Sequence, residues 1–76
     1  MKIVHSYHWT LKKRYRSDIA DDSIEYAILH SPQLRDKHWK NAYNAMSRIP
    51  PSGRFLKVVY RREGERFIII TAFWVD

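Results

Sequence analysis

The sequence predicts one small α+β domain, in which one or two N-terminal helices pack on a small antiparallel β-sheet that ends in a C-terminal hairpin. Residues 55–62 and 66–75 are both rich in β-branched and aromatic residues, and Glu63-Gly64 between them is a typical turn pair. The first part of the chain instead has apolar residues at helical spacing. A length of 76 residues leaves room for a single core.

The composition limits the class of protein. The chain has no cysteine, which excludes a disulfide scaffold and a cysteine zinc site. No apolar run reaches the roughly 18 residues of a membrane span, and residues 1–5 turn polar too early for a signal peptide. Fourteen Lys and Arg against eight Asp and Glu give a net charge of +6. We therefore expect a cytoplasmic domain with no membrane partner, whose basic surface is either simply solvated or binds a polyanion.

The N-terminal half is expected to contain a strand over residues 2–7, a helix over residues 8–16 and a helix over residues 21–31. Leu11 and Tyr15 are four residues apart, so they are expected to share the apolar face of the first helix. A proline follows the second helix and ends it, because the residue before a proline avoids helical backbone angles.

Residues 33–49 allow two interpretations. Apolar side chains recur there at the spacing of an amphipathic helix, in the order Trp39, Ala42, Tyr43 and Met46. Lys40-Asn41 could instead be a turn between two short strands. The residues by themselves leave both interpretations open.

The hairpin is expected to have two different faces, because side chains alternate along a strand. A turn at Glu63-Gly64 places Arg61 opposite Arg66. The predicted core face carries Leu56, Val58, Tyr60, Phe67, Ile69, Thr71 and Phe73. The other face carries Lys57, Arg61 and Arg66 around Val59, Ile68, Ile70, Ala72 and Trp74. Two opposed arginines repel by a few tenths to about 1 kcal/mol, which a bound anion would relieve; alternatively they extend into water or pair with nearby glutamates at little cost.

The order of these segments resembles a known family. His8 opens a short basic helix with Lys12 and Arg14, a second helix contains Ile24-Glu25-Tyr26-Ala27-Ile28-Leu29, and the hairpin of residues 55–60 and 67–73 follows. This order resembles the small nucleases of the barnase–EndoU–colicin–RelE group, in particular its phage-associated and toxin-like members. The resemblance runs from His8 to Phe73. It implies one RelE/barnase-like domain over residues 1–76 and a strand within residues 33–49.

The resemblance implies metal-independent RNA cleavage without a cofactor. In that chemistry a base takes the proton of the ribose 2′-OH, an acid protonates the leaving 5′-oxygen, and fixed cations stabilise the phosphate. His8 is the first candidate for acid–base work, because an unperturbed histidine titrates near pH 6.5; the alternative is a histidine that only packs. Lys57 and Arg61 are the predicted catalytic cations on the hairpin.

Further candidates are ranked below these three. The predicted RNA- and phosphate-binding residues are Lys12, Arg14, Arg54 and Arg66. Tyr60 and Thr71 match positions around the family's sheet site, although the expected register turns both toward the core. His38 and Tyr43 lie in the ambiguous segment. No metal ligands are expected.

Three functions follow from these expectations. The first is a metal-independent endoribonuclease, including the toxin of a toxin–antitoxin pair, whose acidic antitoxin partner would cover the basic surface. The second is a non-catalytic RNA-binding module that uses Trp39 or Trp74 as a stacking platform. The third is a protein-interaction domain or homo-oligomer, because the long apolar strand over residues 67–75 would pair with another chain if it lay at a sheet edge.

Overall fold

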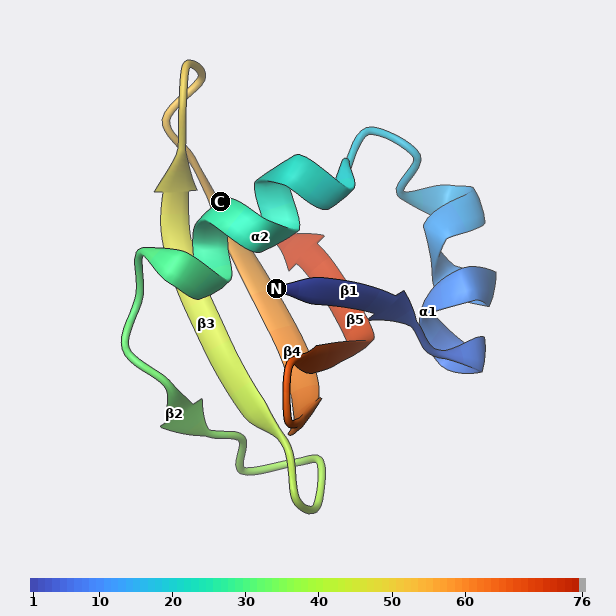
Figure 1. Ribbon diagram of the computed structural model, residues 1–76. Helices are drawn as coiled ribbons and strands as arrows, with labels where there is room; N and C mark the ends of the chain where they lie inside the picture. Colours follow the sequence, from blue (N-terminus) through green and yellow to red (C-terminus); the bar gives the residue numbers. More distant parts are fainter. Residues whose placement is uncertain (76) are drawn as a thin grey trace.

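A five-stranded sheet forms the centre of the computed structural model, which describes residues 1–75 (Figure 1). Helix α2 (Asp21–Leu29) crosses one face of the sheet, and α1 (Tyr7–Lys12) lies beyond the end of β1 (Lys2–His5), beside β5 (Arg66–Trp74) (Figure 1). The α+β class and the C-terminal hairpin are therefore confirmed. In chain order the elements are β1 (Lys2–His5), α1 (Tyr7–Lys12), the 3₁₀ helix η1 (Lys13–Tyr15), α2 (Asp21–Leu29), β2 (Leu34–Arg35), β3 (Tyr43–Ile49), β4 (Arg54–Glu63) and β5 (Arg66–Trp74).

The sheet is mixed, with the strand order β1-β5-β4-β3-β2. The strands from β2 to β5 are antiparallel neighbours, but β1 runs parallel to β5. Strand β5 lies between β1 and β4 and is not an edge of the sheet over the residues that pair with β1. Residues 66–69 of β5 therefore have no free edge at which another chain could pair in the way that was considered.

The first helix is shorter than expected and buries a different face. Ser6 caps α1, because its side-chain oxygen accepts a hydrogen bond of 3.1 Å from the backbone N–H of Trp9. Trp9 is fully buried in the core, whereas Leu11 and Tyr15 are 39% and 88% exposed. The expected apolar face of the helix was therefore wrong, since the bulky indole decides which side of this six-residue helix packs inward.

No helix within residues 1–75 is long and apolar enough to cross a membrane.

The second helix is confirmed, and it covers the main core. Ile24, Ala27 and Ile28 are its buried residues, at the helical spacing that brings them to one face. They pack against the sheet side chains that face α2. The core cluster consists of Trp9, Ile19, Ile24, Ala27, Ile28, Ala45, Ile49, Leu56, Val58, Tyr60, Phe67, Ile69 and Ala72.

Of the two interpretations of residues 33–49, the helical one is wrong. This segment forms β2, a turn in which Asn41 has a left-handed φ of 57°, and β3. The other interpretation, two short strands with a turn at Lys40-Asn41, is confirmed, and a strand is present as the resemblance implied. Tertiary pairing decides the outcome, because all seven residues of β3 pair with β4 and place Ala45 and Ile49 in the core.

The hairpin register differs from the expected one. The turn lies at Gly64-Glu65, so Glu63 faces Arg66, and Arg61 faces Ile68. Gly64 has a φ of 62°, which suits the first position of a two-residue hairpin turn. The expected Arg61–Arg66 pair was wrong, and no repulsion between these two side chains has to be relieved.

A bulge also changes which side chains share a face. Val59 pairs with Thr71 but Tyr60 pairs with Ile69, so β5 contains one extra residue, Ile70. An extra residue reverses the alternation of the side chains beyond it. Ala72 and Trp74 therefore lie on the α2 side, and Thr71 and Phe73 lie on the opposite side, which corrects the expected placement of all four.

Candidate nucleic-acid interface

The sheet face opposite α2 carries the candidate site, and we call it the open face (Figure 1). Alternation along β4 places Lys57, Val59 and Arg61 there, and their pairing partners on the neighbouring strands lie on the same face. The strand residues of the open face are Lys2, Val4, Leu34, Asn44, Met46, Arg48, Phe55, Lys57, Val59, Arg61, Glu63, Arg66, Ile68, Ile70, Thr71 and Phe73.

The loop between β2 and β3 folds over the middle of the open face. Trp39, which is half-buried, packs there against Ala42, Val59 and Ile70 and forms a second, smaller apolar cluster. The indole is thereby fixed on the sheet surface. Trp39 is thus the central aromatic side chain of the open face.

Asp36 organises this loop. Its carboxylate accepts hydrogen bonds from the backbone N–H groups of His38 (3.0 Å) and Trp39 (2.6 Å) and from the side-chain amide of Asn44 (3.3 Å). Partial burial acts to raise the pKa of Asp36, but these hydrogen bonds and the charge of Lys57 together hold it below its ordinary value. Asp36 is therefore charged at neutral pH and acts as the anchor that positions His38 and Trp39.

Two imidazoles contact the same indole. The ring centroids of His8 and Trp39 are 5.2 Å apart in an edge-on arrangement, and those of His38 and Trp39 are 5.8 Å apart. His8 lies in the first turn of α1, and His38 lies in the loop held by Asp36. The fold therefore brings His8, the first candidate for acid–base work, and His38, a lower-ranked candidate, to the same side chain.

Lys57 and His38 share a hollow beside the indole. This hollow has a volume of about 570 Å³ and is lined by Leu34, Arg35, Asp36, Lys37, His38, Asn44 and Lys57. His8 does not line it and contacts Trp39 instead. Within residues 1–75, no hydrogen bond or ion pair joins His8 to the cations of the hairpin.

The two hairpin arginines lie apart. The Arg61 guanidinium donates a hydrogen bond of 3.5 Å to the backbone carbonyl of Lys40, so it flanks the Trp39 loop. Arg66 lies at the turn end of β5, opposite Glu63 and beside Lys2. Arg61 therefore belongs to the site around Trp39, and Arg66 lies at the margin of the sheet.

The remaining predicted phosphate ligands lie elsewhere. Arg54 is on the α2 side, where its guanidinium stacks 4.4 Å from the Trp74 ring and lies 3.8 Å from the Asp18 carboxylate. Of the two tryptophans considered as stacking platforms, only Trp39 is therefore on the open face. Lys12 and Arg14 are exposed on α1 and η1.

The tyrosines and the threonine have structural surroundings. Tyr60 is buried in the main core, 6.0 Å from the ring of Tyr43 and 5.6 Å from that of Phe67, and burial raises its pKa. Thr71 accepts a hydrogen bond of 3.1 Å from the Arg16 guanidinium. Tyr43 and Tyr60 face α2, on the other side of the sheet from Trp39, whereas Thr71 is on the open face and its hydroxyl is bound by Arg16.

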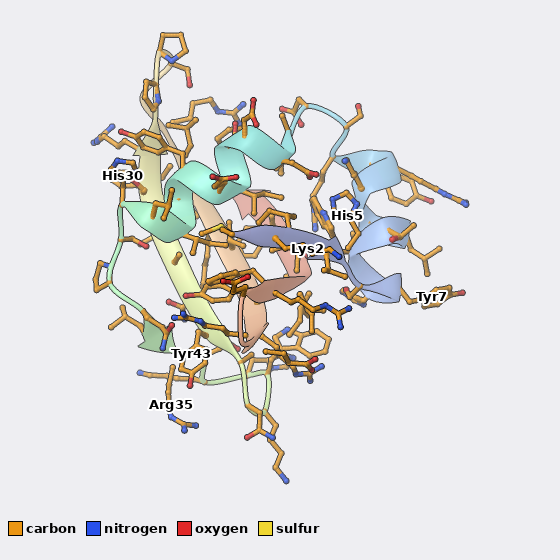
Figure 2. All side chains as sticks on the ribbon, in the orientation of Figure 1. Lys2, His5, Tyr7, His30, Arg35 and Tyr43 are labelled. Atoms are coloured by element: carbon orange, nitrogen blue, oxygen red, sulfur yellow. The ribbon has the colours of Figure 1, made fainter. Side chains whose placement is uncertain are left out.

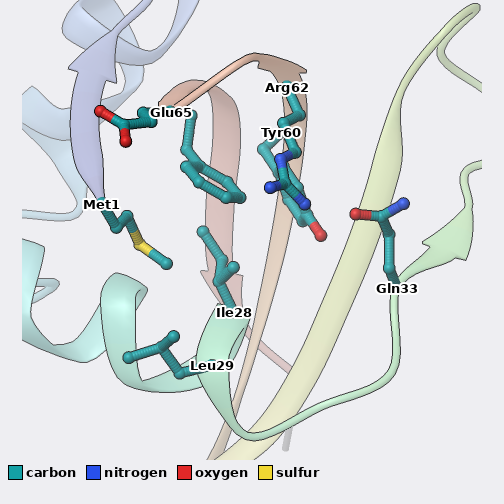
Figure 3. Close-up of a pocket in the computed structure, with 8 residues that line it drawn as sticks. Met1, Ile28, Leu29, Gln33, Tyr60, Arg62 and Glu65 are labelled. Atoms are coloured by element: carbon teal, nitrogen blue, oxygen red, sulfur yellow. The ribbon is translucent and has the colours of Figure 1, made fainter.

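A second hollow lies on the α2 side of the hairpin (Figure 3). It has a volume of about 450 Å³ and is bordered by Tyr60 and Arg62 on β4, with Gln33 across from them. Met1 and Leu29 close its other side (Figure 3). It is separated from the open face by the thickness of the sheet.

Asp36 and Asn44 are residues of this site that were not predicted. Only Asp36 had a usable signal, since an aspartate followed by a polar stretch is typical of a turn in which the carboxylate binds backbone N–H groups further along.

Comparisons with protein-family models, curated proteins and solved structures found no match. Among residues 1–75, no group of three or more His, Cys, Asp or Glu side chains is arranged to hold a metal ion.

Proposed function

We propose that this protein binds single-stranded RNA across the open face of its sheet. The observation that carries the proposal is the fixed indole of Trp39 with Lys57 and Arg61 on either side of its loop. Lys and Arg bind the phosphates of a single strand, and aromatic rings stack on its bases. The one carboxylate inside this cluster, Asp36, has its charge bound by three N–H donors.

Cleavage of the bound RNA is a second candidate function, and one specific observation favours it. His38 and His8 contact the same indole, and Lys57 shares a hollow with His38. A neutral imidazole would take the 2′-OH proton while that oxygen attacks the adjacent phosphate. The second, protonated imidazole would give its proton to the leaving 5′-oxygen, and Lys57 would stabilise the negative charge on the phosphate. An acidic partner protein of the antitoxin kind would then inhibit by covering the same cations.

Binding is tested with a labelled single-stranded RNA and fluorescence anisotropy over a series of salt concentrations. The double variant Lys57→Ala/Arg61→Ala is expected to weaken binding and to lower the salt slope by about 0.7 for each phosphate that the variant no longer neutralises. The matched control is Arg54→Ala/Arg62→Ala, which removes the same charge from the α2 face of the same strand. Equal losses of affinity in both double variants would show that only net charge matters and would overturn the proposal.

Cleavage is tested by incubating the protein with the same RNA in EDTA and analysing the ends for 2′,3′-cyclic phosphate. His38→Ala and His8→Ala are expected to lose turnover while keeping affinity, and His30→Ala, which alters a histidine stacked on Tyr26 at the end of α2, serves as control. Binding without any product from the wild type would reject cleavage and leave the binding proposal standing.

A further inference from the structure

We infer that α1 and η1 form a second RNA-binding surface, which lengthens the site on the open face. Its members are the exposed rings of Tyr7 and Tyr15, the exposed side chain of Leu11 between them, and the cations Lys12 and Arg14. We call this set the α1 row. The inference rests on the proposed binding of RNA to the open face.

The tyrosines and the leucine of the α1 row are exposed although they are large and mainly apolar. Tyr7 is 81% exposed, Tyr15 is 88% exposed and Leu11 is 39% exposed, whereas Trp9 between them is fully buried. Tyr7 points away from the sheet (Figure 2). Because Trp9 fills the core, the α1 row is left on the outer side of the helix, where its rings are available to stack.

The charge around the α1 row favours a polyanion. Residues 1–17 contain five Lys or Arg and no Asp or Glu. Two of these cations are occupied, since Lys13 lies 3.8 Å from the Asp21 carboxylate and Arg16 donates to Thr71. Lys12 and Arg14 are exposed, and within residues 1–75 neither makes an ion pair or a side-chain hydrogen bond.

This combination fits a single nucleic-acid strand better than a protein surface. The core of a protein interface is depleted of charged residues, and of lysine in particular, whereas the row has the exposed cations Lys12 and Arg14 in a segment without any acidic residue. Exposed tyrosine rings stack on any base, and neighbouring cations bind the backbone phosphates without reading sequence. The α1 row therefore has the two components of a sequence-tolerant single-strand binding surface.

The α1 row is next to the proposed site. His8, which directly follows Tyr7, contacts Trp39 on the open face. The first turn of α1 is held in place by the Ser6 cap. A strand that leaves Trp39 past His8 would therefore reach Tyr7 at once and continue along α1.

The test compares RNA oligonucleotides of about 5 and about 15 nucleotides, since only the longer one can occupy both surfaces. Tyr7→Ala/Tyr15→Ala is expected to weaken binding of the long oligonucleotide about tenfold or more, because one or two bases no longer stack on a ring, and that of the short one less than about twofold. Tyr7→Phe/Tyr15→Phe keeps both rings and is expected to restore the affinity. All four substitutions are at exposed positions, and circular dichroism verifies the fold.

The outcomes separate this inference from the proposed function. A wild type that binds neither oligonucleotide overturns both. Normal binding of the long oligonucleotide by Tyr7→Ala/Tyr15→Ala, or an equal loss of affinity for both lengths, overturns the α1 row alone. The matched control Leu29→Ala removes an exposed apolar side chain at the end of α2, outside both the row and the open face. An equal loss of affinity in this control would likewise reject a specific role for the tyrosines.

Discussion

Replacement of Asp36 by alanine measures how strongly one carboxylate holds the Trp39 loop on the sheet. The substitution removes the acceptor of three hydrogen bonds, of 2.6, 3.0 and 3.3 Å. Hydrogen bonds to a buried charged group contribute about 1.5–3 kcal/mol each, but loss of an exposed cap of this kind costs typically about 1 kcal/mol. Because Asp36 is partly exposed, we expect the free energy of unfolding to fall by about 1–2 kcal/mol.

The effect is expected to depend on pH with a definite sign. The folded state lowers the pKa of Asp36 below 3.8, so the ionised carboxylate stabilises the fold above that pH. The contribution is lost as pH falls through the lowered pKa. Urea unfolding followed by tryptophan fluorescence should therefore show a gap between wild type and Asp36→Ala at about pH 7 that shrinks toward about pH 3.

Asp36→Asn provides the matched control, because its amide oxygen still accepts hydrogen bonds but carries no charge. Its stability at neutral pH is expected to lie between those of the wild type and Asp36→Ala. A gap that stays constant or widens in acid would refute the assignment of the effect to an ionised Asp36. Equal stability of Asp36→Ala and wild type at neutral pH would show that the loop is held by other interactions.

Three further variants test the packing around the site, each by urea denaturation. Arg16→Ala should lower the free energy of unfolding by about 1–2 kcal/mol, because its guanidinium bonds Thr71 and the carbonyl of Ala72, and an unchanged midpoint would contradict this. Trp9→Phe should lower the free energy of unfolding by less than about 2 kcal/mol, because the buried indole N–H has no hydrogen-bond partner within residues 1–75 and its loss breaks no bond. Trp9→Ala should lower it by about 3–5 kcal/mol, because it leaves a cavity, and equal losses for the two variants would contradict this. Burial raises the pKa of Tyr60 above 10.0, so the neutral phenol stabilises the fold below that pH and this contribution is lost as pH rises further. Tyr60→Phe should therefore lose less stability than the wild type above about pH 10, and identical pH profiles would refute this.

Elements with strong local signals could be predicted from the sequence. The second helix has its apolar residues at helical spacing, and the hairpin combines β-rich runs with a glycine turn. Both signals come from residues close together in the chain. Residues 33–49 have a helical spacing that misleads, because β3 gains its stability from pairing with β4, and a periodicity count does not include that pairing.

The candidate site was predictable in part. Lys57, Arg61 and His8 were expected to be functional, and the fold places all three around the Trp39 loop or in contact with its indole. The sequence did not indicate that His38 shares the hollow of Lys57, nor that Asp36 holds the loop. These relations depend on how a loop folds back over the sheet.

By itself, the sequence determined that this protein is a basic, aromatic-rich α+β domain, because charge, composition and turn chemistry are properties of residues and their immediate neighbours. The tertiary structure decided which side chains share a surface. One bulge at Ile70 reverses the faces of the residues beyond it, and one buried indole, Trp9, turns Tyr7 and Tyr15 outward. Small changes in register or in helix rotation leave the composition untouched but move whole sets of side chains from one face to the other.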